Sequence, residues 1–562
     1  MNRGLVLGLF VLLAAGGAAI FYVTNPPQPP VAPPAAPGDG GQAGNVAGEA
    51  GANAEAVDLS GNKEPDPSGN AAPSVGATGT GAKAAPASAP SREPFVGWEP
   101  PALAILLSGE QFGSIEPCGC SVKQLGGMSR RMDLVAAIEK KGWPVIGFDL
   151  GGTLNQKRAT RQQSKMKFEV TLTALKEMKY KALGMGREEL IQGLDLLTHH
   201  NPDELPFVCA NARLAPADLG LPLPFKIVEA AGLKIAVTGV IGEKIRQAVI
   251  PKAPLREDEK GAGEVEAVPA AEGLKTVFPQ MEAAKPDLYV LLSHGETEEG
   301  LELARLFPKF DLVLAAGGPD DPDPKPKTVG TTLVAQVGAK GKHAGVVGVY
   351  PASESKLRFE LVDLEKDRYP GAPRMRELMK AYQDEILARN LSETESSVPH
   401  PTGETYVGAK VCGSCHKKAY ATWSGSKHAL AYQSLDTGRK GEEATWLSRV
   451  HDPECLACHV TGWQPQEVLR IDGGFLSMKS TPHLAGQQCE NCHGPGSKHT
   501  DLEKLALKNS KVTPELLAGR KSMNVSVDTV ELKVCTKCHD GDNSPTWNFQ
   551  EFWPKVRHVG RD

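Results

Sequence analysis

The motif Cys-x-x-Cys-His occurs four times in the last third of this 562-residue chain. Two thiols at this spacing can form thioether bonds to the two vinyl groups of one haem, and the histidine that follows can bind the haem iron. The motifs therefore predict four covalently bound haem c groups. They are Cys412-Gly-Ser-Cys415-His416, Cys455-Leu-Ala-Cys458-His459, Cys489-Glu-Asn-Cys492-His493 and Cys535-Thr-Lys-Cys538-His539, with His416, His459, His493 and His539 as the predicted proximal iron ligands.

A zinc site is the main alternative for a single motif of this kind, and a redox-active pair of thiols is another. Two zinc sites would also use four Cys-x-x-Cys pairs, but zinc does not require a histidine after each pair. From Thr405 onward the hydrophobic periodicity is weak and loops are many, so we expect no conventional side-chain core. Four haem macrocycles would supply the apolar interior. Residues 401–562 are therefore predicted to form a mostly α-helical and loop-rich multihaem cytochrome c domain.

Three segments of this C-terminal region resemble the cytochrome c-554 family, whose members are tetrahaem electron acceptors of nitrogen-oxidising metabolism. The segments are Tyr406-Val-Gly followed by the first motif, Trp423-Ser-Gly-Ser-Lys-His428, and the third motif followed by Gly494-Pro-Gly-Ser-Lys-His499. The resemblance implies distal iron ligands outside the motifs but does not say which motif each one serves. The implied distal ligands are His428, His451, His499 and His558.

Two further histidines of the region, His400 and His483, are predicted to be solvated. Relatives can leave one iron five-coordinate, so one of the four distal assignments is open. Residues 401–562 carry 20 Lys and Arg against 18 Asp and Glu. Four haems add about eight propionates, so the loaded region should be mildly acidic and should attract a redox partner with a basic patch. The whole chain has a formal net charge of −5, which does not suggest nucleic acid as a partner.

The N-terminal segment predicts export from the cytoplasm. Leu5–Val23 is an apolar run behind Arg3 that is long enough to span a bilayer as a helix. A cleaved signal peptide usually has a shorter apolar core, so we expect residues 1–24 to be an uncleaved transmembrane signal-anchor. Residues 25–97 are rich in Ala, Pro and Gly and are expected to be a disordered linker. The predicted location is the cell membrane, with the bulk of the chain in the periplasm or on the outer face.

Between residues 98 and 365, short β-rich runs alternate with helical patterns, which predicts a layered α/β fold. A charged helical linker over residues 366–400, with its helix at Met375–Asn390, is expected to follow. Strands are predicted at Leu103–Leu107, Val145–Phe148, Ile235–Val240, Leu288–Leu292, Leu312–Ala315 and Thr332–Val337, and helices at Arg130–Lys141 and Phe168–Met178.

This middle region resembles the 5′-nucleotidase family of metallophosphoesterases in its framework residues. The matching segments are Ile105–Gly113, Gly126–Arg131, Phe207–Asn211, Leu291–Gly295 and Thr331–Tyr350. The resemblance implies a metallophosphoesterase-like layered sandwich. That family hydrolyses phosphate esters with two metals, which activate a water and clamp the phosphate.

Most of the metal ligands of that family are missing from this chain. Of the positions where the family has ligands, only His294 keeps a ligand residue. One histidine cannot hold two metals, so we expect no dinuclear metal site and no hydrolysis by that mechanism. At the other ligand positions this chain has different residues. It has Glu110 and Phe112 where the family has Asp-x-His, Gly152 where it has the bridging Asp, Met185 and Gly186 where it has Asn-His, and Gly317 and Pro319 where it has the final His-x-His.

Cys118 and Cys120 lie two residues apart on a predicted loop of the middle region. They can be structural thiols, or one can form a disulfide with Cys209, or the pair can bind a metal or sulfur and pass electrons to the haems. A bridge between the two would be strained. Cys209 lies in an apolar strand and is expected to be buried.

These patterns together predict an exported, membrane-anchored tetrahaem cytochrome that relays electrons between periplasmic redox proteins, with no residue assigned to catalysis. One alternative is an oxidoreductase that acts on a small nitrogen or sulfur compound at an open haem. Another is a metal-dependent phosphohydrolase fused to a cytochrome, and a third makes the middle region a docking module. Whether the chain is an enzyme stays open.

Overall fold

The structure is a computed structural model that describes residues 93–117, 125–154, 160–197, 205–214, 220–250, 265–438 and 443–558. These residues all belong to one compact unit, Pro86–Asp562. The predicted signal-anchor, most of the predicted linker 25–97, and both Cys118 and Cys120 lie outside the described residues. Within the described ranges, no helix combines the length and the apolar character needed to cross a membrane.

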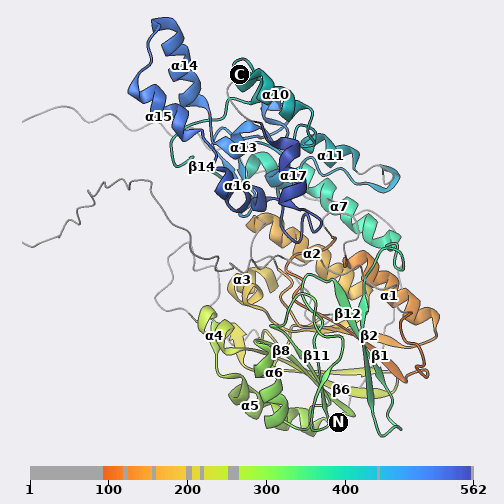
Figure 1. The fold of residues 1–562 in the computed structure, drawn as a ribbon. Helices are drawn as coiled ribbons and strands as arrows, with labels where there is room; N and C mark the ends of the chain where they lie inside the picture. Colours follow the sequence, from red (N-terminus) through yellow and green to blue (C-terminus); the bar gives the residue numbers. More distant parts are fainter. Residues whose placement is uncertain are drawn as a thin grey trace, which may run out of the picture. The chain divides into compact units, whose positions relative to one another are not determined.

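Two β-sheets form the middle region (Figure 1). The first has the strand order β13-β12-β1-β2-β3, in which β1 is parallel to β2 and antiparallel to β12. The second has the order β10-β11-β9-β8-β6-β5, with β6, β8, β9 and β11 parallel. The strands are β1 Leu103–Ser108, β2 Val145–Asp149, β3 Tyr180–Leu183, β5 Lys226–Ala230, β6 Leu233–Ile241, β8 Leu288–His294, β9 Leu312–Ala315, β10 Lys327–Val329, β11 Thr332–Ala335, β12 His343–Val349 and β13 Leu357–Asp363. A small separate sheet pairs β4 Ala212–Leu214 with β7 Val265–Ala267.

Strand β1 shows how the layers are built, because all six of its residues are buried. Successive side chains of a strand point to opposite faces of the sheet. Leu103, Ile105 and Leu107 enter the core between the two sheets, and Ala104 and Leu106 enter the core beneath the helices on the other face. A strand that is covered on both faces needs apolar residues at every position, which explains the continuous apolar run in the sequence.

Helices cover the outer faces of both sheets. Helices α1, α2 and α7 pack on the first sheet, and α5 and α6 pack on the second, which gives four layers. This arrangement agrees with the predicted layered α/β sandwich. The helices of this part are α1 Met128–Lys140, α2 Arg161–Glu177, α3 Arg187–Leu197, α4 Glu243–Val249, α5 Ala270–Ala283, α6 Thr297–Leu306, α7 Pro373–Arg389 and α8 Leu391–Thr394.

The predicted strands all form, with ends that shift by one or two residues. Helix α2 begins at Arg161, well before the predicted start at Phe168, because the side chain of Thr160 caps it by accepting a hydrogen bond from Gln163 N at 3.2 Å. The predicted helix Met375–Asn390 is α7, which begins at Pro373 and ends where Asn390 adopts a left-handed conformation. Four residues of α7, Met375, Met379, Tyr382 and Ile386, are buried in the same core as α1 and α2.

The C-terminal region consists of short helices and one small sheet, β14-β16-β15. In the described part of this region one small cluster of apolar side chains is buried, so the expectation that the region has no side-chain core was wrong in part. The cluster contains Leu435, Leu456, Ala457, Val460, Trp463, Val468, Phe475 and Leu484. The elements are β14 Ser397–Val398, α9 Ala409–Gly413, α10 Lys417–Ser424, α11 Ala431–Thr437, α12 Pro453–His459, β15 Trp463–Gln464, β16 Leu469–Ile471, α13 Cys489–His493, α14 Ser497–Asn509, α15 Pro514–Ser522, α16 Val527–Lys533 and α17 Phe549–Val556.

Candidate haem-binding site

Each Cys-x-x-Cys-His motif forms about one helical turn, at α9, α12, α13 and a 3₁₀ turn at Cys535–Lys537. In the first motif His416 N donates to Cys412 O at 2.9 Å, and in the fourth His539 N donates to Cys535 O at 2.9 Å. Residues three and four apart on a helical turn lie on the same side of it. The turn therefore brings the two thiols and the imidazole of each motif to one side, as attachment to a single haem requires.

Three of the motif histidines have Nδ1 in contact with an oxygen atom. His459 Nδ1 donates to Ala431 O at 2.7 Å, and His493 Nδ1 donates to Met523 O at 2.6 Å. His539 Nδ1 lies 3.2 Å from the hydroxyl oxygen of Ser544. A proton on Nδ1 leaves the lone pair on Nε2, which is the nitrogen that can bind iron, and it fixes the orientation of the ring.

Three motif histidines also face a second histidine ring. The ring centroids are 6.3 Å apart for His416 and His499, 5.9 Å apart for His493 and His558, and 6.1 Å apart for His539 and His428. Two imidazoles that bind one metal from opposite sides, with bonds of about 2.0 Å, have ring centroids about 6 Å apart. The three pairs therefore fit an iron between their rings. The pairs place His499 beside the first motif, His558 beside the third and His428 beside the fourth.

The fourth predicted distal ligand, His451, takes no part in these three ring pairs. It is half-buried and lies next to Asp452, the residue at which α12 begins. The structure thus brings three of the four predicted distal histidines to a motif histidine and does not do so for His451. His483 is exposed, and His400 is half-buried with its Nδ1 2.8 Å from Thr402 Oγ1.

Burial favours the neutral form of several imidazoles in this region. It lowers the pKa of His428, His459, His493 and His499, and it lowers the pKa of His539 to about 4. Nearby histidines lower several of these pKa values further; His416, for example, acts on both His493 and His499. A neutral imidazole has the free lone pair that a metal ligand needs. The electrostatics of the site therefore agree with its geometry.

The motifs lie close to one another. The thiols of Cys412 and Cys489 are in contact, and this contact together with burial raises the pKa of Cys412. Burial, with smaller contributions from Cys535 and Cys538, raises the pKa of Cys492 to about 12. The first motif is therefore adjacent to the third, and the third to the fourth, as a chain of closely packed haems would require.

One buried carboxylate that the sequence did not single out connects two motifs. Glu490 lies between the two cysteines of the third motif and is only 2% exposed. Its carboxylate accepts hydrogen bonds from Val407 N at 2.9 Å, Gly408 N at 2.8 Å and Gly496 N at 2.8 Å. It therefore ties the segment before the first motif to the loop after the third. Its position inside Cys-x-x-Cys carries no signal for this role, because its partners are distant backbone amides.

In the middle region, the structure gathers several positions where metallophosphoesterases have metal ligands. We call Glu110, Phe112, Gly152 and His294 the ligand-position cluster. A Cβ atom on Gly152 would lie 2.9 Å from His294 Cε1 and 3.2 Å from Phe112 Cε1. Burial lowers the pKa of His294 to about 4, and its Nδ1 has no hydrogen-bond partner among the described residues. A phenylalanine ring, a glycine and one histidine do not fit a pair of bridged metals.

Two acidic residues lie in or beside this cluster. Glu189 is fully buried and accepts hydrogen bonds from Thr153 N at 2.5 Å and from Gly186 N at 3.1 Å. Glu110 has a left-handed backbone, with φ of 47°. Burial raises the pKa of Glu110 to about 7, with smaller contributions from the charges of Asp320, Glu296 and Asp149. The Glu110 carboxyl therefore changes its protonation state near neutral pH.

The thiol of Cys209 is buried and free, as the apolar sequence around it predicted. It donates to Asn211 Oδ1 at 3.4 Å, and burial raises its pKa to about 11. The structure shows no disulfide at Cys209 among the described residues. All interpretations of Cys118 and Cys120 remain predictions, since both lie outside the described residues.

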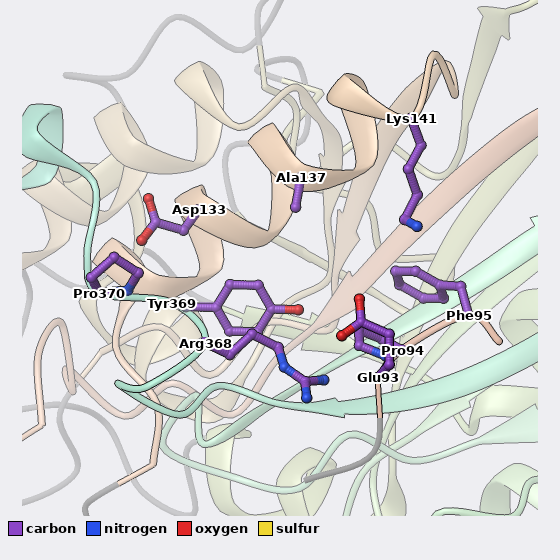
Figure 2. Close-up of a pocket in the computed structure, with 9 residues that line it drawn as sticks. All are labelled: Glu93, Pro94, Phe95, Asp133, Ala137, Lys141, Arg368, Tyr369 and Pro370. Atoms are coloured by element: carbon purple, nitrogen blue, oxygen red, sulfur yellow. The ribbon is translucent and has the colours of Figure 1, made fainter.

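A cavity of about 280 Å³ opens where the described chain begins (Figure 2). The Tyr369 ring crosses it with its hydroxyl turned toward Pro94, and Asp133 accepts a hydrogen bond from Gly371 N at 2.6 Å. None of the predicted site residues lines this cavity. Its walls are formed by Glu93, Pro94, Phe95, Asp133, Ala137, Lys141, Arg368, Tyr369 and Pro370.

Comparison with known proteins supports the resemblance of the C-terminal region to the cytochrome c-554 family. Residues 411–494 match the family model for cytochrome c554 and c-prime. The chain is 28% identical over 167 residues to cytochrome c-554 of Nitrosomonas europaea, which covers 27% of this chain and 66% of that protein. It is 25% identical over 130 residues to the multihaem cytochrome MtrA of Shewanella baltica, which covers 23% of this chain and 35% of that protein. These matches imply haem c as the cofactor of the C-terminal region.

Among solved structures, the chain is similar to a 5′-nucleotidase precursor from Thermus thermophilus. The TM-score is 0.42 and the sequence identity 19%, over 54% of this chain and 61% of that one. The middle region has the layered α/β architecture described above, and a likeness at this level says nothing about its activity.

Replacing His499 with Ala should convert one haem from six-coordinate to five-coordinate, because the ring opposite His416 is lost. In the reduced protein, the variant should bind carbon monoxide at one haem more than the wild type does, measured by optical titration. His428→Ala and His558→Ala should each behave in the same way. His483→Ala, which removes an exposed histidine, is the matched control. Wild-type carbon monoxide binding by all three variants would contradict the ring-pair assignments.

Replacing Glu110 with Gln should stabilise the protein above pH 7. The folded pKa of about 7 exceeds the ordinary value of 4.5, so between these values the folded state binds more protons than the unfolded chain. Stability from this group is therefore fully present below about pH 4.5 and is lost as the pH rises to about 7. Glutamine stays neutral, so the variant should gain on the order of 1–3 kcal/mol at pH 8 and nothing at pH 4. Urea unfolding at both pH values measures the free energy of unfolding of the variant and the wild type, with the exposed Glu229→Gln as control. Equal stabilities of variant and wild type at pH 8 would contradict the prediction.

Proposed function

We propose that this chain is a tetrahaem electron carrier. Eight motif cysteines would hold four haem c groups, and the four motif histidines would be their proximal ligands. His499, His558 and His428 would be the distal ligands at the first, third and fourth motifs. The observation that supports this proposal most directly is the spacing of the three imidazole pairs, between 5.9 and 6.3 Å.

The geometry favours electron transfer over chemistry on a substrate. Haem supplies a one-electron change between its ferric and ferrous states. At three motifs the paired histidines would occupy both axial positions, so a small substrate would find no open site there. The contacts of the first motif with the third, and of the third with the fourth, support the transfer of electrons from one motif to the next. An oxidoreductase would instead need an iron with an open axial position, and the second motif, which belongs to none of the three ring pairs, is where that alternative would apply.

The partners and the location are part of the proposal. Covalent haem attachment takes place outside the cytoplasm, and the apolar run Leu5–Val23 is long enough for a membrane anchor. We therefore propose a membrane-anchored protein whose donor and acceptor are periplasmic redox proteins. Hydrolysis of phosphate esters is not part of the proposed function, since the residues of the ligand-position cluster do not fit two metals.

A pyridine haemochrome assay on protein matured with the cytochrome c machinery should find four haems per chain, one for each motif. The double variant Cys535→Ala/Cys538→Ala should lose one haem, because it removes one pair of thioether bonds. As a control, Cys209→Ala should keep the wild-type number, since Cys209 lies outside the motifs. Two haems or fewer in the wild type, or bound zinc without haem, would contradict the proposed function.

A further inference from the structure

Helix α12, which carries the second motif, begins at a buried carboxylate. Asp452 is 3% exposed, and its Oδ1 accepts a hydrogen bond from Glu454 N at 3.0 Å. This is the usual arrangement of an N-cap, and Pro453 follows at the first helical position. The Asp452 carboxylate has two more partners. Oδ1 also accepts from Gln163 Nε2 at 2.6 Å, and Oδ2 accepts from Gln383 Nε2 at 2.9 Å.

Both glutamines belong to helices outside the C-terminal region. Gln163 is a fully buried residue of α2, and its Nε2 also contacts Tyr382 Oη at 3.0 Å. Tyr382 and Gln383 belong to α7, which packs beside α2 and α1 (Figure 1). Burial raises the pKa of Tyr382 well above its usual value, and the charges of Asp452 and Glu454 act in the same direction. The start of α12 is therefore bonded to the helical layer of the middle region.

A second contact lies one turn further along α2. Lys167 is 8% exposed, and its Nζ donates to both carboxylate oxygens of Glu454, at 2.8 and 2.7 Å. Gln163 and Lys167 are four residues apart, so they lie on the same face of α2. They hold Asp452 and Glu454, which lie at the beginning and in the first turn of α12. Because these two contacts are spaced one turn apart on α2, they fix the direction of α12 as well as its position.

Further ion pairs connect the same two parts of the chain. Arg449, which precedes α12, donates from Nη2 to Glu116 Oε2 at 2.7 Å. Lys340 Nζ lies 2.8 Å from Asp542 Oδ2, three residues after the histidine of the fourth motif. The middle region therefore contacts residues that flank the second and the fourth motif.

We infer that the middle region is a platform that positions the second haem motif, with Gln163 and Lys167 as its main positioning residues. This inference rests on the proposed function. A seven-residue helix has too few internal hydrogen bonds to be stable alone, so its contacts decide where it lies. Lys167 also balances the charge of Glu454 beside Cys455, so it acts on the potential of a haem bound there. A region without the ligands for hydrolysis thus has a function in electron transfer.

The test compares Gln163→Leu and Lys167→Met with Arg374→Met. The control removes an ion pair of similar geometry between α7 and α2, because Arg374 Nη2 lies 2.7 Å from Glu177 Oε1 and neither residue belongs to the C-terminal region. Spectroelectrochemical titration of fully loaded protein should show one midpoint potential lowered in Lys167→Met, because a positive charge next to Glu454 is removed. The other potentials should stay at their wild-type values. Reversing the pair in Lys167→Glu/Glu454→Lys should restore the shifted potential toward the wild-type value.

Hydrogen exchange gives a second measurement, independent of the potentials. In Gln163→Leu, backbone amides of residues 449–459 should exchange faster than in the wild type. Those of α9 should be unchanged, since α9 carries the first motif and is held by Glu490 and Gln488 instead. Arg374→Met should leave residues 449–459 unchanged.

The outcomes separate this inference from the proposed function. Two haems or fewer in the wild type would contradict the proposed function. A full set of haems with no selective change in potential or exchange would overturn only the inference. Equal changes at all four haems, or the same changes in Arg374→Met, would also overturn it, because they would show general destabilisation.

Discussion

The C-terminal region depends on contacts between imidazoles that are far apart in the chain. His416 meets His499, His493 meets His558, and His539 meets His428, while the short helices between them bury only one small apolar cluster. Burial lowers the pKa of His428, His493, His499 and His539, so these four rings favour their neutral form and attract their neighbours only weakly. A haem iron bound between each pair would hold the two imidazoles together, and in such domains the free energy of metal binding becomes free energy of folding.

The two regions share one buried polar network, centred on Asp452. Its carboxylate is bonded to its own helix, to α2 and to α7. Removing one partner of a buried carboxylate leaves it unsatisfied at a cost of about 1–3 kcal/mol or more. The network therefore resists independent movement of α12 and α2. Helix α7 is itself a structural part of the middle region, because its apolar face lies in the same core as α1 and α2.

The repeating patterns of the sequence were sufficient for much of this architecture. Apolar runs such as Leu103–Leu107 predicted strands, and the structure buries β1 on both faces. The first two turns of α2 were missed because its start depends on the cap at Thr160. The motif Asp452-Pro453 is a recognisable helix start, and it could have located α12. The roles of Gln163 and Glu490 could not have been found, because their partners are remote in sequence.

The sequence by itself determined the chemistry of the C-terminal motifs, because cysteine spacing and the following histidine are local and one helical turn brings them together. It also determined that the ligands of a dinuclear metal site are missing, since this depends only on residue identity. Only the tertiary structure decided which distal histidine faces which motif and which residues hold α12. Those pairings join residues that are tens to hundreds of positions apart, and their distances depend on packing that no local pattern encodes.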